Sequence, residues 1–228
     1  MRKALIIAAL AAMAVTAASC GKVKNMTGKM KKTQADSTAV EWTAIKPVEL
    51  CLKPVDIFAN DWMALSMGNK NESNSMTIAW GGIGELWGKH VVTVYVSSDR
   101  ASKRLMDKYN YFTVTAFPDT PACKDGLLYI GSHSYSEEKD KMANSGLTFE
   151  YTELGNPIIS EGNLAIECKK IYADEFEPDK MPADVRENFY SRMGLHTMYI
   201  GEIVNVWTKE TMKAEEQSDS QSEQLQVQ

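Results

Sequence analysis

The chain has 228 residues, which is enough for one domain of ordinary size with tails at its ends. Hydrophobic residues make up 44% and charged residues 24% of the chain, the balance expected of a soluble globular domain. The formal net charge of -5 argues against general nucleic-acid binding, because that function needs a basic surface.

The first twenty residues predict an exported protein. Arg2 and Lys3 precede an uncharged apolar run, and small residues follow up to Cys20, an order typical of a secretory signal over residues 1–19. The run is shorter than the about 20 apolar residues that span a bilayer. A cysteine directly after small residues resembles a bacterial lipobox, although Ala17 stands where leucine is usual. We therefore predict lipidation of Cys20, with an ordinary secreted protein as the alternative.

The segments on either side of the predicted domain are polar. Residues 20–41 carry five lysines before the first acid, so we expect a flexible basic tether, either a plain linker or one that contacts anionic lipid headgroups. Gly21 lacks the acidic character associated with inner-membrane retention, which favours an anchor in the outer membrane, facing the periplasm. Residues 209–228 are rich in Glu, Gln and Ser and predict a disordered acidic tail. The domain is expected to cover residues 42–208.

Hydrophobic patterning between the tails predicts more strands than helices. Expected strands cover residues 62–67, 76–80, 90–96, 111–117, 164–176 and 198–207. Expected helices are short and cover residues 102–109, 124–130 and 137–144, and another begins near Pro182. Residues 70–74 predict a polar turn, and Gly81 and Gly82 predict a turn or a β-bulge. Short strands with brief peripheral helices predict a mainly β fold, a β-barrel decorated with helices.

Few motifs point to catalysis. The glycines of residues 81–84 do not match the dinucleotide fingerprint, because no helical pattern follows them. Neither a Walker sequence nor a GxSxG elbow occurs, so no catalytic residue is assigned. Of the three histidines, His196 is as strong a candidate for a functional residue as for a structural one. Cysteine and histidine spacing predicts no zinc site, and three cysteines after Cys20 leave at least one thiol unpaired or bridged to another chain.

The loop at residues 97–104 is the strongest candidate for a ligand site. It follows the best-predicted strand and opens a helix, and it combines three cations with several serine hydroxyls. Such groups at a helix N-terminus suit a phosphate. A solvated charged loop is the alternative.

Four blocks of sequence, in order, resemble the flavin reductase-like, FMN-binding split-barrel family. Residues 74–87 (NSMTIAWGGIGELW) are similar to its segment N-x-M-T-x-x-W-G-G-x-G-x-L-W. Residues 95–113, 168–176 and 189–203 resemble its later blocks, and the resemblance extends over about 62–207. It implies a split β-barrel that binds FMN, and a homodimer whose cofactor lies where two barrels meet.

The resemblance also implies a set of site residues. Backbone groups of residues 74–77 would meet the edge of the flavin ring, an aromatic side chain and glycine would lie against it, and Arg100 with Ser102 would hold the phosphate. The implied cofactor-binding residues are Asn74, Ser75, Met76, Thr77, Ala79, Trp80, Gly81, Ser97, Arg100, Ser102, Lys103, Lys141 and His196.

The sequence departs from the family at two places. Ala101 stands where tyrosine is usual in the phosphate loop. Residues 134–141 replace the family's Ser-Gly-Arg-Asp-x-Asp-Lys, so that an arginine is lost, and Lys141 is expected to compensate for it.

Two functions are compatible with these observations. The first is an FMN-dependent oxidoreductase of flavin reductase type, whose electron donor and acceptor are not assigned. Its exported location and the lack of a nicotinamide motif favour a quinone, a redox protein or a ferric compound as partner. The alternative is a non-catalytic module of the same fold that binds flavin or another planar ligand at the cell envelope.

Overall fold

The computed structural model describes residues 41–209, which belong to the compact unit Ala39–Gln228. The predicted signal peptide, Cys20, nearly all of the basic tether and nearly all of the acidic tail lie outside the described residues. None of the helices in the described part is long and apolar enough to cross a membrane.

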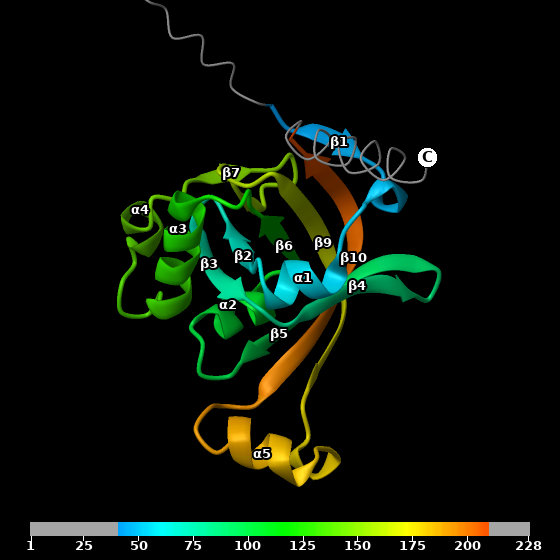
Figure 1. Cartoon of the computed structure of the whole chain (residues 1–228), viewed down its shortest axis with the longest axis vertical. Helices are drawn as coiled ribbons and strands as arrows, with labels where there is room; N and C mark the ends of the chain where they lie inside the picture. The colour runs from blue at the N-terminus through cyan, green and yellow to red at the C-terminus, as the bar shows by residue number, and fades with distance from the viewer. Residues whose placement is uncertain (1–40, 210–228) are drawn as a thin grey trace, which may run out of the picture. The chain divides into compact units, whose positions relative to one another are not determined.

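Strands dominate the fold, as predicted, and the helices are short (Figure 1). The strands are β1 (Thr43–Ile45), β2 (Met63–Asn69), β3 (Glu72–Ile78), β4 (Gly81–Leu86), β5 (Lys89–Ser97), β6 (Tyr111–Ala116), β7 (Phe149–Tyr151), β8 (Pro157–Ile159), β9 (Leu164–Glu175) and β10 (His196–Thr208). The helices are α1 (Pro54–Ala59), α2 (Ser102–Lys108), α3 (Pro121–Ser132), α4 (Lys141–Asn144) and α5 (Ala183–Phe189), with 3₁₀ turns at Pro47–Glu49 and Pro178–Lys180.

Eight strands form one antiparallel sheet in the order β3-β2-β6-β9-β10-β5-β4, and β1 pairs with β10 off this path. The long strand β10 joins the strands β3-β2-β6-β9 to the hairpin β5-β4, because it pairs with β9 along one side and with β5 along the other. Its first residue, His196, lies opposite Ser97 at the end of β5, and its last residue, Thr208, lies opposite Thr43 of β1. The start of β10 is therefore separated by the length of the strand from the place where the chain enters the sheet.

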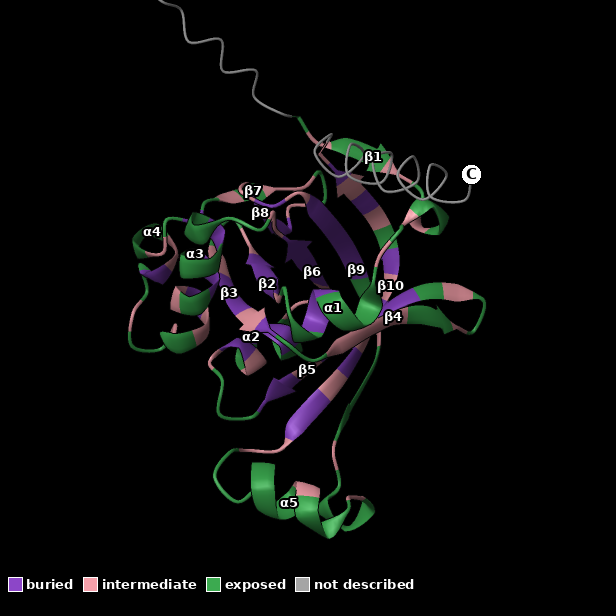
Figure 2. Cartoon of the chain, viewed as in Figure 1, coloured by how far each residue is buried: buried purple, intermediate pink, exposed green. Residues whose placement is uncertain are grey.

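The core follows from the β-branched and aliphatic character of these strands. Val92, Val94 and Val96 of β5 are fully buried and alternate with less buried positions, as a strand with one covered face requires (Figure 2). A glycine at position 201 of β10 lets the neighbouring strands close, because a Cβ there would lie 2.6 Å from Phe112 and Cys168. The helix α3 covers β3 and adds a second, smaller apolar cluster.

Several predicted boundaries need correction. The predicted helix at residues 137–144 is helical only over Lys141–Asn144, since Ser134 instead organises a turn through its carbonyl and hydroxyl. The predicted turn at residues 70–74 is confined to two residues, because β3 already begins at Glu72. Pro182 caps α5 instead of lying in its first turn.

The largest correction concerns Gly81 and Gly82, which lie within β4 and do not form a turn or a bulge. Gly81 is paired with Val94, and a Cβ at this glycine would lie 2.2 Å from the ring of Phe58. The glycine is therefore a place of close approach between α1 and β4, not a chain break.

Candidate functional site

The candidate residues gather where β10 begins, β5 ends and the loop before α2 passes the last turn of α3. We call Asn74, Ser102, Arg100 and Lys141, with the last turn of α3, the polar end of the site. We call Trp80, His196, Phe189 and Tyr190 the aromatic end.

Asn74 and Ser102 form the buried part of the polar end. The Asn74 amide donates a hydrogen bond of 2.8 Å to the Ser102 hydroxyl, and both side chains are buried. The Asn74 Oδ1 atom is also buried, and it has no hydrogen-bond partner within the described chain. A buried acceptor without a donor is unfavourable in a folded protein, so this oxygen suits a ligand that supplies one.

Arg100 forms the exposed part of the polar end. Its Nη1 donates a hydrogen bond of 3.0 Å to the carbonyl of Gly131, the residue before the end of α3. Gly131 lies directly against Thr77, whose hydroxyl donates to the Leu127 carbonyl. The guanidinium has five donors in a planar fork, and this bond takes up one of them. Arg100 is thus held in place while it can still bind an anion.

Lys141 lies beneath the same helix end and is 2% exposed. Its ammonium donates to the carbonyls of Ile130 and His133 at 3.0 and 3.1 Å. Burial, together with the positive charge of Arg100, lowers the pKa of Lys141 from its ordinary value to about 8. Lys141 therefore neutralises the negative end of the α3 dipole, a role the sequence does not reveal.

Two other predicted residues are occupied by contacts of their own. The Lys103 ammonium forms an ion pair of 2.6 Å with Asp107 and lies over the ring of Tyr199. The Ser97 hydroxyl donates a hydrogen bond of 3.0 Å to the Gly194 carbonyl. Ser97 thereby ties the segment before β10 to the loop that carries Arg100.

Apart from the side chain of Asn74, the strand β3 offers mainly backbone groups to the site. Met76 is buried in the core, and the Ser75 hydroxyl donates to the Leu65 carbonyl. Because β3 lies at one end of the sheet order, its outer edge has no strand partner among residues 41–209. Its unpaired N–H and C=O groups are available to a ligand, as the resemblance implies for residues 74–77.

The aromatic end is built from segments far apart in the sequence. The Trp80 ring lies 5.1 Å from the His196 ring and 5.7 Å from the Phe189 ring, and Tyr190 meets His196 edge-on at 5.7 Å. Trp80 is 43% exposed, whereas His196 is buried with an Nδ1 atom that finds no partner in the described chain. Burial and the nearby Arg100 lower the pKa of His196, so its imidazole is neutral at pH 7.

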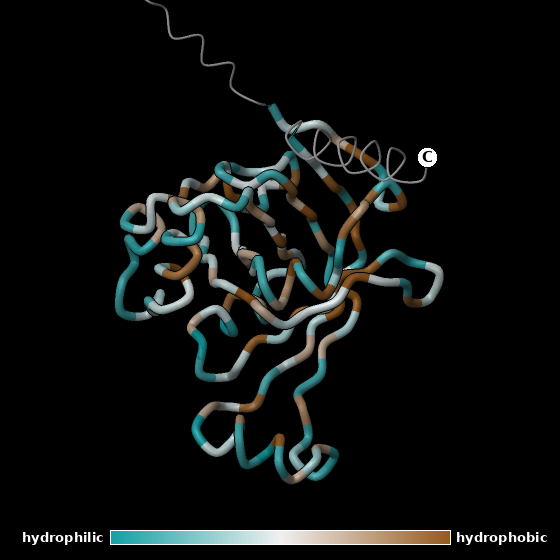
Figure 3. Tube along the Cα trace, viewed as in Figure 1, coloured by the Kyte–Doolittle hydropathy of each residue, from teal (hydrophilic) through white to brown (hydrophobic). Residues whose placement is uncertain are grey.

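Phe189 and Tyr190 belong to an arm formed by residues 176–195, which connects β9 to β10 and carries α5. No residue of α5 is buried, and the arm is largely hydrophilic with isolated hydrophobic positions (Figures 1 and 3). These two aromatics lie in one of the blocks that resemble the family, but neither is among the predicted site residues. Two adjacent aromatics in an otherwise polar segment were the available signal.

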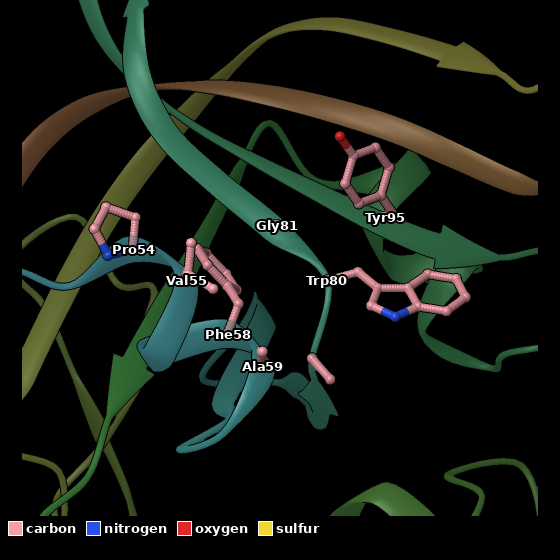
Figure 4. Close-up of a pocket in the computed structure, with 8 residues that line it drawn as sticks. Pro54, Val55, Phe58, Ala59, Trp80, Gly81 and Tyr95 are labelled. Atoms are coloured by element: carbon pink, nitrogen blue, oxygen red, sulfur yellow. The ribbon is translucent and has the colours of Figure 1, made fainter.

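Trp80 also takes part in the lining of an apolar groove of about 420 Å³ (Figure 4). Figure 4 shows the α1 side chains on one side of Gly81, and Trp80 with Tyr95 on the other. The groove is lined by Pro54, Val55, Phe58, Ala59, Ala79, Trp80, Gly81 and Tyr95. Three of these, Ala79, Trp80 and Gly81, are predicted cofactor-binding residues. The contribution of α1 was not predicted, although Pro54 and Asp56 in its first turn are signals of a helix start.

Comparison with known proteins agrees with this architecture. Residues 65–223 match the family model described as flavin reductase like domain, and no curated protein matches the chain.

Solved structures with the same fold include an FMN-binding domain of a flavin reductases-like enzyme from Shewanella baltica (16% identity, TM-score 0.53, covering 75% of this chain and 78% of that one). Flavoredoxin of Desulfovibrio vulgaris is similar at 24% identity and a TM-score of 0.51, over 73% of this chain and 78% of that one. NADH:FAD oxidoreductase SgcE6 of Streptomyces globisporus is similar at 16% identity and a TM-score of 0.50, over 64% and 74%. These likenesses confirm the predicted split-barrel fold.

Proposed function

The chain belongs to the flavin reductase like family, and on this basis we propose that it binds FMN and acts as an oxidoreductase that passes electrons through the bound flavin. FAD is the alternative cofactor, because one solved relative is an NADH:FAD oxidoreductase. The polar end supports FMN, since it offers one arginine fork and one serine hydroxyl at a single place, which suits one terminal phosphate.

The observation that carries this proposal is the unpartnered Oδ1 of Asn74. This buried oxygen lies next to Ser102 and the loop of Arg100, at the unpaired edge of β3. A flavin has N–H and hydroxyl donors that such an acceptor binds, and a phosphate that Arg100 and Ser102 bind. The residues present therefore fit the cofactor.

Each part of the site has its own task. Arg100 and Ser102 would hold the phosphate, the edge of β3 would orient the ring, and Trp80 would cover it with apolar surface. Bound FMN would supply the transfer of one or two electrons, which none of these side chains performs. His196, neutral and buried beside Trp80, would add no charge next to the ring.

A spectrum and one pair of variants test the proposal. The full chain, purified from its native host, is expected to show a flavin absorption spectrum that a reductant bleaches. Asn74→Ala should weaken FMN binding roughly fivefold to tenfold, the cost of one lost hydrogen bond. Asn163→Ala is the matched control, because Asn163 also has an unpartnered buried Oδ1 but lies before β9, outside the candidate site. A colourless protein that does not bind added FMN would contradict the proposal.

A homodimer is part of the same proposal. The supporting observation is exposed apolar surface: Trp80 of the site and Trp87 in the turn between β4 and β5 are 43% and 67% exposed. An isologous two-fold contact is the commonest way to cover such surface. Light scattering of the mature chain above micromolar concentration should give twice the monomer mass, and a clean monomer would contradict this part.

Lipid anchoring through Cys20, at the periplasmic face of the outer membrane, is also proposed. It rests on the signal-like first residues and the small residues before Cys20. Cys20→Ser should release the protein from the membrane fraction. Fractionation of the variant together with the wild type would refute the anchor.

The contacts of Lys141 favour a second candidate, a flavin- or planar-ligand-binding module without turnover. Two of its three N–H donors are bound to carbonyls of α3 and the following residue, which reduces its use as a substitute for the missing family arginine. In that case FMN would bind only weakly, and no donor would reduce the bound flavin at a useful rate.

A further inference from the structure

The apolar groove has a lining that restricts its occupant. Apart from the phenol of Tyr95, its side chains carry no ionisable group, and Val55 of α1 leaves most of its surface exposed at the rim. A volume of about 420 Å³ lies in the lower part of the range for small-molecule sites. The groove therefore suits a small and largely apolar ligand.

The charge of the groove lining distinguishes two classes of electron carrier, nicotinamide dinucleotides and uncharged ring compounds. A nicotinamide dinucleotide has a pyrophosphate, which needs cations or backbone N–H donors around it. The groove has no cation in its lining, and α1 begins with Pro54, which lacks an N–H, followed by the carboxylate of Asp56 in the first turn. Placing a phosphate against this surface would cost its hydration without a compensating contact.

Two aromatic residues supply a stacking face and a hydrogen-bond donor, the two contacts that an uncharged ring compound with a carbonyl group needs. Trp80 offers a face for stacking, and it is shared with the aromatic end, where the flavin ring is proposed to lie. The Tyr95 ring is fixed by Phe176 at 5.5 Å, while its hydroxyl makes no hydrogen bond within residues 41–209. A free phenol in an apolar groove is a donor for a carbonyl oxygen.

We propose that the apolar groove binds an uncharged planar carbonyl compound of the quinone class. The role of this compound as the flavin's partner rests on the proposed function, but its binding does not, because Val55, Phe58 and Tyr95 form the groove without any cofactor.

Calorimetric titration of the full chain with 2-methyl-1,4-naphthoquinone tests this inference, with and without saturating FMN. Val55→Glu should weaken quinone binding at least about tenfold, because it places a charge at the rim of an apolar site. Val48→Glu is the matched control, since Val48 is 70% exposed and lies outside the groove. Tyr95→Phe should weaken binding roughly fivefold to tenfold through the lost hydrogen bond.

Three outcomes would overturn the inference: equal quinone affinity in Val55→Glu and Val48→Glu, competition of NAD⁺ with the quinone at similar affinity, or conversion of a dimer to monomers by Val55→Glu. The last would show that the groove is a contact between subunits.

An FMN titration of the same samples separates this inference from the proposed function. Loss of FMN binding with quinone binding retained would refute only the proposed function, and the reverse result would refute only the quinone site.

Discussion

The polar end and the aromatic end of the site are held in different ways. Arg100 and Lys141 are fixed by hydrogen bonds to the last carbonyls of α3, a helix that packs on β3. Phe189 and Tyr190 come from an arm whose helix buries no residue. Hydrogen bonds hold the arm at its two ends, through Phe176, Gly194 and Leu195, whereas Phe189 and Tyr190 themselves meet the barrel through ring contacts. The polar end is therefore held by the folded barrel, whereas the two aromatics of the arm depend on a few edge contacts of an exposed segment.

This difference has a consequence for ligand binding. Charge-assisted hydrogen bonds at the polar end are directional and can be removed one at a time. Ring contacts at the aromatic end act on any flat ligand, with or without a phosphate. Variants at the two ends should therefore be distinguishable by comparing FMN with riboflavin, which lacks the phosphate.

The largest contrast is expected in hydrogen exchange. Amides of α5 should exchange at least about a hundredfold faster than those of β5, because local opening is easy where no side chain is buried. Exchange followed by mass spectrometry on the full chain measures both segments together. Similar protection of α5 and β5 would mean that another surface, such as a second subunit, covers the arm.

The pH dependence of stability tests how Lys141 is held. Its pKa falls from 10.5 when unfolded to about 8 when folded, so between these values the unfolded chain binds more protons. The free energy of unfolding should therefore rise with pH across this window, by about 3 kcal/mol in total. Urea unfolding from pH 7 to 10 measures it as the difference between wild type and Lys141→Met, which lacks this contribution. Parallel curves for the two proteins would show that the ammonium is not buried as described.

Arg100→Ala should affect the two flavins unequally. Loss of a charge-assisted hydrogen bond costs roughly 1.5–3 kcal/mol, so FMN affinity should fall about tenfold to a hundredfold. Riboflavin affinity should change little. Arg100→Lys is the control that keeps the charge and loses the fork. Equal losses for both flavins would show that Arg100 supports the loop or the ring, and not the phosphate.

The elements predicted correctly from the sequence are those whose formation depends on residues close to one another in the chain. The alternating valines of β5 and the inward pair Leu105 and Met106 of α2 have periodicities visible in the sequence alone, and both elements occur as predicted. The prediction of a turn or bulge at Gly81 was wrong, because the reason for a glycine there lies far away in the sequence: the ring of Phe58 occupies the space that a Cβ would need.

The candidate site also combines residues that the sequence predicts with contacts that it does not. Arg100, Ser102 and Asn74 belong to sequence blocks with a recognisable pattern, so the sequence alone predicts them as site residues. The buried state of Lys141 depends on carbonyls eight and eleven residues earlier in the chain, and the contact between Trp80 and Phe189 spans more than a hundred residues. Neither leaves a periodic signal, because both arise from how the elements pack together.

The smallest effect is expected for Phe189→Ala, and it tests whether the arm belongs to the site at all. Phe189 is 43% exposed and touches Trp80 by its edge, so its removal should lower the free energy of unfolding by less than about 1 kcal/mol. If its ring also covers the flavin, FMN and riboflavin affinity should both fall by the same factor, roughly twofold to tenfold. Leu154→Ala is a matched control, since Leu154 is 57% exposed and lies between β7 and β8. Unchanged affinity for both flavins in Phe189→Ala would place the arm outside the site. A loss confined to FMN would contradict the division into a polar and an aromatic end, because Phe189 has no group that can recognise a phosphate.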